Sequence, residues 1–232
     1  MPMHNSATGW PAPPEGTSDP VPARYWGVWS RTLLETPQTR DTTTLVRWMQ
    51  LGQWHVDLRV PVAPDAPLQG FSGITRVTQV GAQEMCTWQR LVDYQPPRAT
   101  VDEGWMVFET KEQVVETGIH GVYREVWDRL PGSTGRRIAL AEPPRADGIP
   151  IARLFASGDY LMRVRPAEPL TPAFEISFGT LVDGKFSIEA STISALTGTC
   201  KELSLSRMSA TVAEVGMDSV PSAWEILEWQ EA

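Results

Sequence analysis

A short segment of the sequence, WHVDLRV at residues 54–60, carries residue types that are typical of acid–base chemistry. Its polar residues, His55, Asp57 and Arg59, alternate with apolar ones, so in a β-strand the three share one face. Histidine has an unperturbed pKa near 6.5 and exchanges protons readily at neutral pH, and a neighbouring charged group can orient it or bind a ligand. His55 and Asp57 are therefore candidate catalytic residues, and Arg59 is a candidate ligand-binding residue.

The alternation in this segment does not say which face points into the protein. If the apolar residues pack inward, the polar face lies in solvent. If the interior is polar, Asp57 and Arg59 meet Arg90 and Glu125 there, because buried charges persist mainly when they are paired and hydrogen-bonded. Glu125 would then need Arg59, Arg90 or a tyrosine hydroxyl as its partner.

A second alternating segment, GVYREVWDRL, lies in the middle of the chain. Tyr123, Glu125 and Trp127 fall on one face of the expected strand, and Arg124 and Asp128 fall on the other. The aromatic face is expected to point inward, because burial of apolar area stabilises a fold by roughly 25 cal/mol per Å² and Tyr and Trp carry more of it than Val. Tyr123 and Glu125 are thus candidate catalytic residues, and Trp127 is a candidate ligand contact.

Cys86, Trp88 and Arg90 share one face of another expected strand. The planar guanidinium of Arg90, flanked by Trp88 and Asp93, suits a ligand carboxylate, which it can bind through two parallel hydrogen bonds. The same group can instead pair with a protein carboxylate and stack on the indole. Trp88 and Arg90 are therefore candidate ligand-binding residues, with a structural role as the alternative.

His120 lies between Gly118 and Gly121, at an expected turn next to the strand of Tyr123 and Glu125. A histidine at a barrel mouth is well placed to act as an acid or base. With a carboxylate and a tyrosine it could remove a proton next to a carbonyl, eliminate, or add water without a cofactor. The alternative is an ordinary surface histidine. His120 completes the set of candidate catalytic residues.

The sequence as a whole predicts an almost entirely β protein. Short β-branched and aromatic runs recur between glycine and proline turn signals from Ala23 onward. Gly81-Ala82 and Asp183-Gly184 each separate two such runs and predict hairpins. A last strand is expected from Ala223, whereas the pattern weakens between residues 195 and 220 and suits a short helix or irregular closure. About ten strands with little helix indicate an up-and-down antiparallel barrel, which leaves no strand edge exposed.

The domain organisation follows from the same pattern. Residues 1–22 are rich in proline and predict a mobile tail. Residues 23–232 are expected to form a single barrel domain, with the Pro-rich segment 141–150 as a seam between its two halves.

The composition of the chain indicates which classes of binding partner are expected. The net charge of −8 argues against nucleic acid, because phosphate binding needs a basic surface. No apolar run is long enough to predict a membrane span, and the start of the chain lacks the features of a secretory signal. A cytoplasmic protein with reduced Cys86 and Cys200 is therefore expected. A small-molecule ligand or substrate is the expected partner, and the sequence leaves a homodimer open.

Metal and cofactor sites are not expected. The three histidines and two cysteines lack metal-ligand spacing, and no Gly-rich phosphate loop follows a strand and opens a helix.

Several short motifs resemble those of known barrel proteins. Gly27-Val28-Trp29 resembles the Gly-x-Trp element of lipocalins and other calycins. Further motifs are similar to elements of the Hri family of lipocalin-like proteins, described from fungi and with bacterial relatives. These motifs are Glu116-Thr117-Gly118, Tyr123-Arg124-Glu125-Val126-Trp127, Trp224-Glu225-Ile226-Leu227-Glu228 and, matching the bacterial branch, Asp57-Leu58-Arg59-Val60-Pro61 and Cys86-Thr87-Trp88-Gln89-Arg90.

The resemblance implies a calycin-type β-barrel and no defined family activity, so no catalytic residue is carried over. The chain departs from secreted lipocalins because it lacks a secretory signal and a disulfide framework. It has no histidine after His120, and so lacks the C-terminal histidine that binds haem in some intracellular lipocalin-like barrels.

Three functions remain compatible with these observations. The first is binding of a small, largely apolar or aromatic molecule in a barrel pocket, with an Arg/carboxylate group at its polar end. The second is a cofactor-independent lyase, hydratase or isomerase that uses His55 or His120 with Asp57, Tyr123 or Glu125 in the same pocket. The third is a barrel filled by its own side chains that acts as a protein-interaction module.

Overall fold

The computed structural model describes residues 20–63, 65–93, 101–143, 152–166, 174–217 and 220–231. Within these ranges the prediction of an almost entirely β protein is confirmed, since the helical segments are two 3-10 turns, η1 (Ala23–Tyr25) and η2 (Ser194–Leu196). No helix in this part of the chain is long and apolar enough to cross a membrane. The predicted tail falls outside the described residues except for its end, where Val21 is buried.

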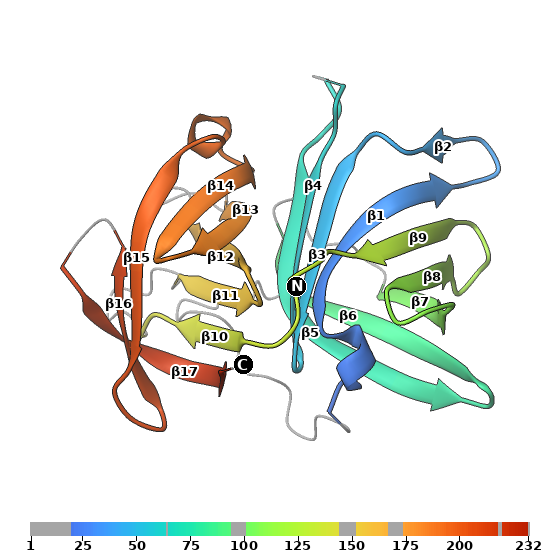
Figure 1. Ribbon diagram of the computed structural model, residues 1–232. Coiled ribbons are helices and arrows are strands. Elements are labelled where there is room, and N and C mark those ends of the chain that lie inside the picture. Colours follow the sequence, from blue (N-terminus) through green and yellow to red (C-terminus); the bar gives the residue numbers. More distant parts are fainter. Residues whose placement is uncertain are drawn as a thin grey trace, which may run out of the picture.

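The first half of the chain forms a nine-stranded antiparallel sheet in the order β2-β1-β3-β4-β5-β6-β7-β8-β9. Its strands are β1 (Gly27–Glu35), β2 (Arg40–Asp41), β3 (Leu45–Leu51), β4 (Trp54–Val60), β5 (Gln69–Val80), β6 (Gln83–Asp93), β7 (Asp102–Phe108), β8 (Gln113–Gly118) and β9 (Arg124–Arg129). β1 pairs with β3 on one side and with β9 on the other, so the sheet closes on itself, and β2 extends only the end of β1. We call this closed sheet the first barrel; it runs from blue to green in Figure 1.

The second half of the chain forms a closed antiparallel barrel of consecutive strands, which we call the second barrel. Its strands are β10 (Arg137–Ala141), β11 (Arg153–Ser157), β12 (Tyr160–Pro166), β13 (Phe174–Val182), β14 (Lys185–Ser191), β15 (Cys200–Arg207), β16 (Val212–Met217) and β17 (Ser222–Gln230). Pairing of β10 with β17 closes it. The predicted hairpin at Asp183-Gly184 is confirmed, because Val182 pairs with Lys185 and both turn residues have positive φ angles, 50° and 73°.

The architecture differs from the sequence prediction in the number of barrels. The sequence predicts one barrel of about ten strands, whereas the described residues form seventeen strands in two closed sheets. The two barrels join between β9 and β10 at residues 130–136. The expected seam at 141–150 instead falls between β10 and β11, inside the second barrel, and its residues 144–150 lie outside the described residues. Local patterns cannot distinguish these cases, because closure depends on pairing between strands that are distant in sequence.

The two barrels lie side by side (Figure 1), and an apolar core belongs to both. β3 and β4 of the first barrel contact β10, β11, β13 and β14 of the second. Buried residues of this shared core are Val28, Met49, Leu51, Trp54, Val56, Leu58, Ile74 and Val92 from the first barrel, and Ala139, Ala141, Phe155, Met162, Val164, Ile176, Phe178 and Ala190 from the second. The outer surface of each barrel is therefore apolar where the other barrel covers it.

The interiors of the two barrels differ in character. The second barrel is filled mostly by aliphatic side chains, such as Leu154, Leu161 and Ile188. The first is filled by aromatic ones, and at the start of its first strand η1 inserts the fully buried Tyr25. η1 lies at the beginning of β1, so Tyr25 closes one end of the first barrel, and the other end carries the β1–β2 turn.

Candidate functional site

The strand β4 is buried on both faces. Its contacts show which face points into the first barrel, a question that the sequence leaves open. Trp54, Val56 and Leu58 pack into the core shared with the second barrel. Asp57 therefore points into the first barrel together with the other polar residues of the strand and is 2% exposed. The polar lumen is thus the correct alternative, and the apolar face lies outside the first barrel because the second barrel covers it.

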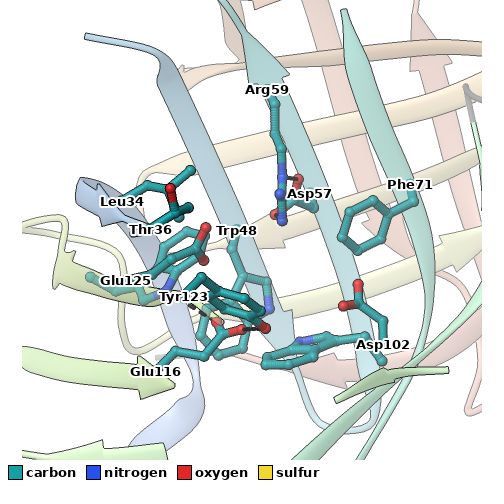
Figure 2. Close-up of a pocket in the computed structure, with 12 residues that line it drawn as sticks. Leu34, Thr36, Trp48, Asp57, Arg59, Phe71, Asp102, Glu116, Tyr123 and Glu125 are labelled. Atoms are coloured by element: carbon teal, nitrogen blue, oxygen red, sulfur yellow. Dashed lines mark hydrogen bonds and ion pairs between the residues drawn. The ribbon is translucent and has the colours of Figure 1, made fainter. Parts of the chain in front are cut away.

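A cavity of about 240 Å³ lies in the first barrel, toward the end that carries the β1–β2 turn. Its walls combine aromatic rings with carboxyl groups, a guanidinium and a phenol. The lining residues are Leu34, Thr36, Trp48, Asp57, Arg59, Phe71, Trp88, Asp102, Glu116, Tyr123, Glu125 and Trp127. Figure 2 shows the polar side chains converging on the same space from several strands. Six of the nine candidate residues from the sequence line this cavity: Asp57, Arg59, Trp88, Tyr123, Glu125 and Trp127.

Two arginines on one side of the cavity are paired with protein carboxylates and stack on one phenyl ring. Arg59 Nε donates to Asp57 Oδ1 at 2.7 Å, and Arg90 contacts Asp102 Oδ2 at 2.5 Å and Asp93 Oδ2 at 3.1 Å. The guanidinium carbon of Arg90 lies 3.5 Å from the centre of the Phe71 ring, and that of Arg59 lies 5.4 Å from it. Of the two roles considered for Arg90, the structure shows the pairing with protein carboxylates, and it stacks on Phe71 in place of Trp88.

Glu125 faces the interior, as the sequence predicts for its strand, but its hydrogen-bonded partner is none of the three that the sequence suggests. Its Oε1 accepts a hydrogen bond from Arg31 Nη1 at 2.8 Å, and Arg31 also reaches Asp41 Oδ2 at 3.0 Å. Arg31 comes from β1, which becomes a neighbour of β9 only when the barrel closes. Burial raises the pKa of Glu125, and the positive charges of Arg59 and Arg31 oppose that rise.

Glu116 is the carboxyl group of the cavity with no cationic partner among the described residues. It is 5% exposed, and it accepts hydrogen bonds from the Tyr123 hydroxyl at 2.7 Å and from Trp127 Nε1 at 3.2 Å. Burial raises the pKa of Glu116 well above its usual range, and the charge of Glu125 raises it further. Burial and the charge of Glu116 likewise raise the pKa of Tyr123. Glu116 is therefore the cavity group most suited to exchange a proton.

Three indoles form the aromatic wall of the cavity. The Trp48 ring lies edge-to-face with Trp88, at 5.8 Å between centroids and 80° between planes, and with Trp127, at 5.7 Å and 73°. Aromatic rings prefer such geometry because the positive edge of one meets the negative face of another. Trp48 Nε1 is buried and has no hydrogen-bond partner in the described part of the chain.

The two candidate catalytic histidines are not part of this cavity. His55 points into the first barrel but lies nearer its closed end, at the level of Gln50 and the start of β1, where its Nδ1 contacts Thr75 Oγ1 at 3.1 Å. His120 is exposed in the turn between β8 and β9. The sequence correctly predicts that His55 lies in a strand and His120 in a turn. Neither the face of a strand nor the position of a turn shows how far along the barrel axis a side chain lies.

Several cavity residues were not identified from the sequence. Glu116 had a signal that could have identified it: in the β8–β9 hairpin it pairs directly with Glu125, so the two side chains share one face of the sheet. The lining residues Trp48, Phe71 and Asp102 had no such signal, and neither had Arg31, which bonds to Glu125. The alternating pattern of each strand alone does not say which strands meet across a lumen.

The arrangement can surround an aromatic or aliphatic group with indole rings and present carboxyl oxygens to its polar end. The described residues hold no group of three or more histidine, cysteine or acidic side chains placed to bind a metal ion. Glu116 with Tyr123 could also donate or accept a proton at a bound molecule.

Comparison with known proteins gives the fold and no activity. No family model matches the chain, and no curated protein matches it. The crystal structure of the uncharacterized protein YLR301w from Saccharomyces cerevisiae is similar, with a TM-score of 0.63 and 14% sequence identity over 88% of this chain and 98% of that chain. At this identity the likeness supports the β-barrel fold alone.

Proposed function

We propose that the first barrel binds a small, largely apolar or aromatic molecule in its cavity, with the carboxyl and guanidinium groups around the polar end of the ligand. The observation that carries this proposal is a cavity of about 240 Å³ in an aromatic interior. An apolar cavity of about 150 Å³ is large enough to bind benzene. The cavity of the first barrel thus suits one aromatic ring with a short polar chain.

The resemblance to the Hri family of lipocalin-like proteins supports the same proposal. Four of the motifs that carry the resemblance lie on β4, β6, β8 and β9, and each of the four contributes at least one residue to the cavity lining. We infer that the chain is a bacterial-type member of this family and that these motifs describe its ligand cavity.

A cofactor-independent lyase, hydratase or isomerase is a second candidate, and the hydrogen-bonded pair of Glu116 and Tyr123 favours it. The raised pKa of Glu116 suits a general acid at neutral pH. This activity would not use His55 or His120, since neither lines the cavity. An enzyme of this class should exchange the α-protons of phenylacetaldehyde with deuterated solvent faster than buffer does, and the variant E116Q should not.

The binding proposal is tested with 2-phenylethanol, a neutral probe with one ring and a short polar chain. Trp48, Trp88 and Trp127 line the cavity, so saturable binding should change the intrinsic tryptophan fluorescence. Leu34 lines the cavity, and the variant L34W should fill it and abolish the change, whereas L33W at the neighbouring position, which is not among the lining residues, should retain it. A probe that fails to saturate the parent protein at millimolar concentration, or that binds L34W equally well, would contradict the proposal.

A further inference from the structure

We infer that the polar end of the ligand is a protonated amine, which binds between Glu116 and the indole wall of the first barrel. This inference rests on the proposed function, since it names the chemical class of ligand for the same cavity. It follows from the pairing of the charged groups, from the geometry of the tryptophans and from polar atoms that the protein leaves without a full partner.

The arginines around the cavity are already neutralised by the protein. Arg59 pairs with Asp57, Arg90 with Asp93 and Asp102, and Arg31 with Glu125 and Asp41. Each of these guanidinium groups has at least one carboxylate within 3.1 Å, so an anionic ligand would have to compete with a protein carboxylate for it. The geometry thus argues against capture of a ligand carboxylate by Arg59 or Arg90.

Among the described residues around the cavity, negative groups exceed positive ones. Glu116 adds a further carboxyl group to the five that pair with the three arginines, and it forms no ion pair with any described residue. Both of its oxygens accept hydrogen bonds from neutral donors, Tyr123 and Trp127. The ionised form of a buried carboxyl group is unfavourable without a cation, and a ligand ammonium group beside Glu116 would stabilise that form.

The aromatic wall fits a cation equally well. Trp48 lies edge-to-face with Trp88 and with Trp127, so its ring plane makes a steep angle with each of the other two, and we call the three indoles the box. An ammonium group over an indole face is attracted by the ring quadrupole, and tryptophan is the strongest of the aromatic residues in this role. Arg90 stacks on the ring of Phe71 at 3.5 Å, so that ring already has a cation of the protein. The three indoles of the box and the phenol ring of Tyr123 are the lining rings left for a cationic ligand.

A buried polar atom on the same wall, Trp48 Nε1, also supports a bound ligand. Trp48 is 2% exposed and lines the cavity, yet its Nε1 has no partner among the described residues. A buried donor without an acceptor costs free energy. A hydroxyl or carbonyl oxygen on the bound amine would accept this hydrogen bond.

Three probes that share one ring and differ in charge test the inference: phenethylamine as the cation, 2-phenylethanol as the neutral compound and 3-phenylpropanoate as the anion. Calorimetric titration at pH 7 should show the amine binding at least about tenfold more tightly than the alcohol, and the anion binding most weakly. In E116Q the advantage of the amine over the alcohol should fall below about threefold. E109Q removes the same charge from an exposed site outside the cavity lining and should retain the full advantage.

A second measurement uses the unaltered protein and does not depend on the folding of a variant. A cation that binds beside a protonated Glu116 should displace its proton, so titration of phenethylamine in phosphate and in Tris should give different heats, whereas titration of 2-phenylethanol should not. If the alcohol binds as tightly as the amine, or if E116Q keeps the preference, the inference is overturned while the binding cavity stands. If none of the three probes binds, the proposed function itself fails.

Discussion

His55 is a histidine sealed inside the first barrel, and its hydrogen bonds fix its tautomer. The Thr75 hydroxyl donates to Gln50 Oε1 at 2.7 Å, so Thr75 Oγ1 accepts from the ring, and Nδ1 carries the hydrogen. The other nitrogen, Nε2, is buried and has no partner among the described residues. A proton on Nε2 would place an unpaired charge in the core, and burial accordingly lowers the pKa of His55 to about 3.

The lowered pKa of His55 predicts that acid destabilises the protein. An unfolded histidine titrates near 6.5, so between that value and about 3 the unfolded chain binds a proton that the native protein does not. This contribution to stability is present above pH 6.5 and is lost as the pH falls, by about 2 kcal/mol between pH 7 and pH 5. The variant H55N, which keeps a polar atom near the position of Nδ1, should lose that dependence in urea unfolding measured at both values.

The matched control for this prediction is H120N, which replaces a histidine in the exposed β8–β9 turn and should keep the acid sensitivity of the parent protein. The raised pKa of Glu116 acts in the opposite direction, since its contribution to stability is present at low pH and is lost as the pH rises. Parent and variant must therefore be compared at each pH. An equal loss of stability in H55N and in the parent protein would show that another group is responsible.

Individual residues of the cavity were predictable where the pattern of a strand forced their side. Tyr123, Glu125 and Trp127 had to share a face, and the larger apolar area of the rings correctly turned that face inward. The partner of Glu125 was not predictable, because Arg31 lies 94 positions away and reaches it only through the pairing that closes the barrel. The alternation within a strand predicts which side chains share a face. The contacts across the lumen depend on the closure of the whole sheet.

At the scale of elements, β4 explains why an alternating strand can mislead. In a lone barrel its apolar face would be expected to point inward and its polar face outward. Here the apolar face, with Trp54, Val56 and Leu58, lies in the core shared with the second barrel, and the charged face lines the cavity. A strand that lies between two packed barrels has no face in solvent. Its alternation therefore shows which face meets polar side chains and which meets apolar ones, but it does not show which face points into its own barrel.

The connection between the barrels is held by the β11–β12 turn. Asp159 N donates to Gly132 O at 2.9 Å, Gly158 N donates to Arg136 O at 2.9 Å, and Ser157 Oγ donates to Ser133 O at 2.7 Å. These bonds attach the connecting segment to the second barrel along its length. The short link between β9 and β10 is therefore a packed part of the structure that fixes how the two barrels meet.

Replacement of Gly158 by alanine should loosen this connection. Gly158 has a φ of +55°, which disfavours a side chain, and a Cβ there would lie 1.9 Å from the carbonyl oxygen of Gly132. Gly81 has a similar φ of +61°, and a Cβ there would meet no atom within 4 Å. We expect G81A to lower the free energy of unfolding by about 1–2 kcal/mol from backbone strain alone. G158A should lower it by a further 1–3 kcal/mol or so, because the backbone must move to relieve the clash. Equal unfolding midpoints in urea for the two variants would contradict this account.

At the scale of the whole molecule, the shared core makes the two barrels one cooperative unit. Eight buried side chains from each barrel meet in it, among them Trp54 and Leu58 from the first and Met162 and Phe178 from the second. If the barrels separated, each would expose this apolar surface to water. Interfaces between independent domains are smaller and more polar as a rule, and the chain is therefore expected to unfold in one transition even though it closes two separate sheets.

The distribution of tryptophans allows a direct test of this cooperativity. Six tryptophans lie on strands of the first barrel and two on strands of the second, so fluorescence reports chiefly on the first barrel, whereas far-UV circular dichroism reports on both. The two signals should give coincident transitions in urea.

Met162 lies in the shared core on the second barrel, and M162A should lower the midpoint of both signals together, by about 2–5 kcal/mol in free energy of unfolding. M208A, at a second-barrel position that is 62% exposed, should leave both midpoints unchanged. If M162A shifts the circular dichroism transition but not the fluorescence transition, the barrels unfold independently. In that case packing against the second barrel is not what turns the charged face of β4 toward the cavity.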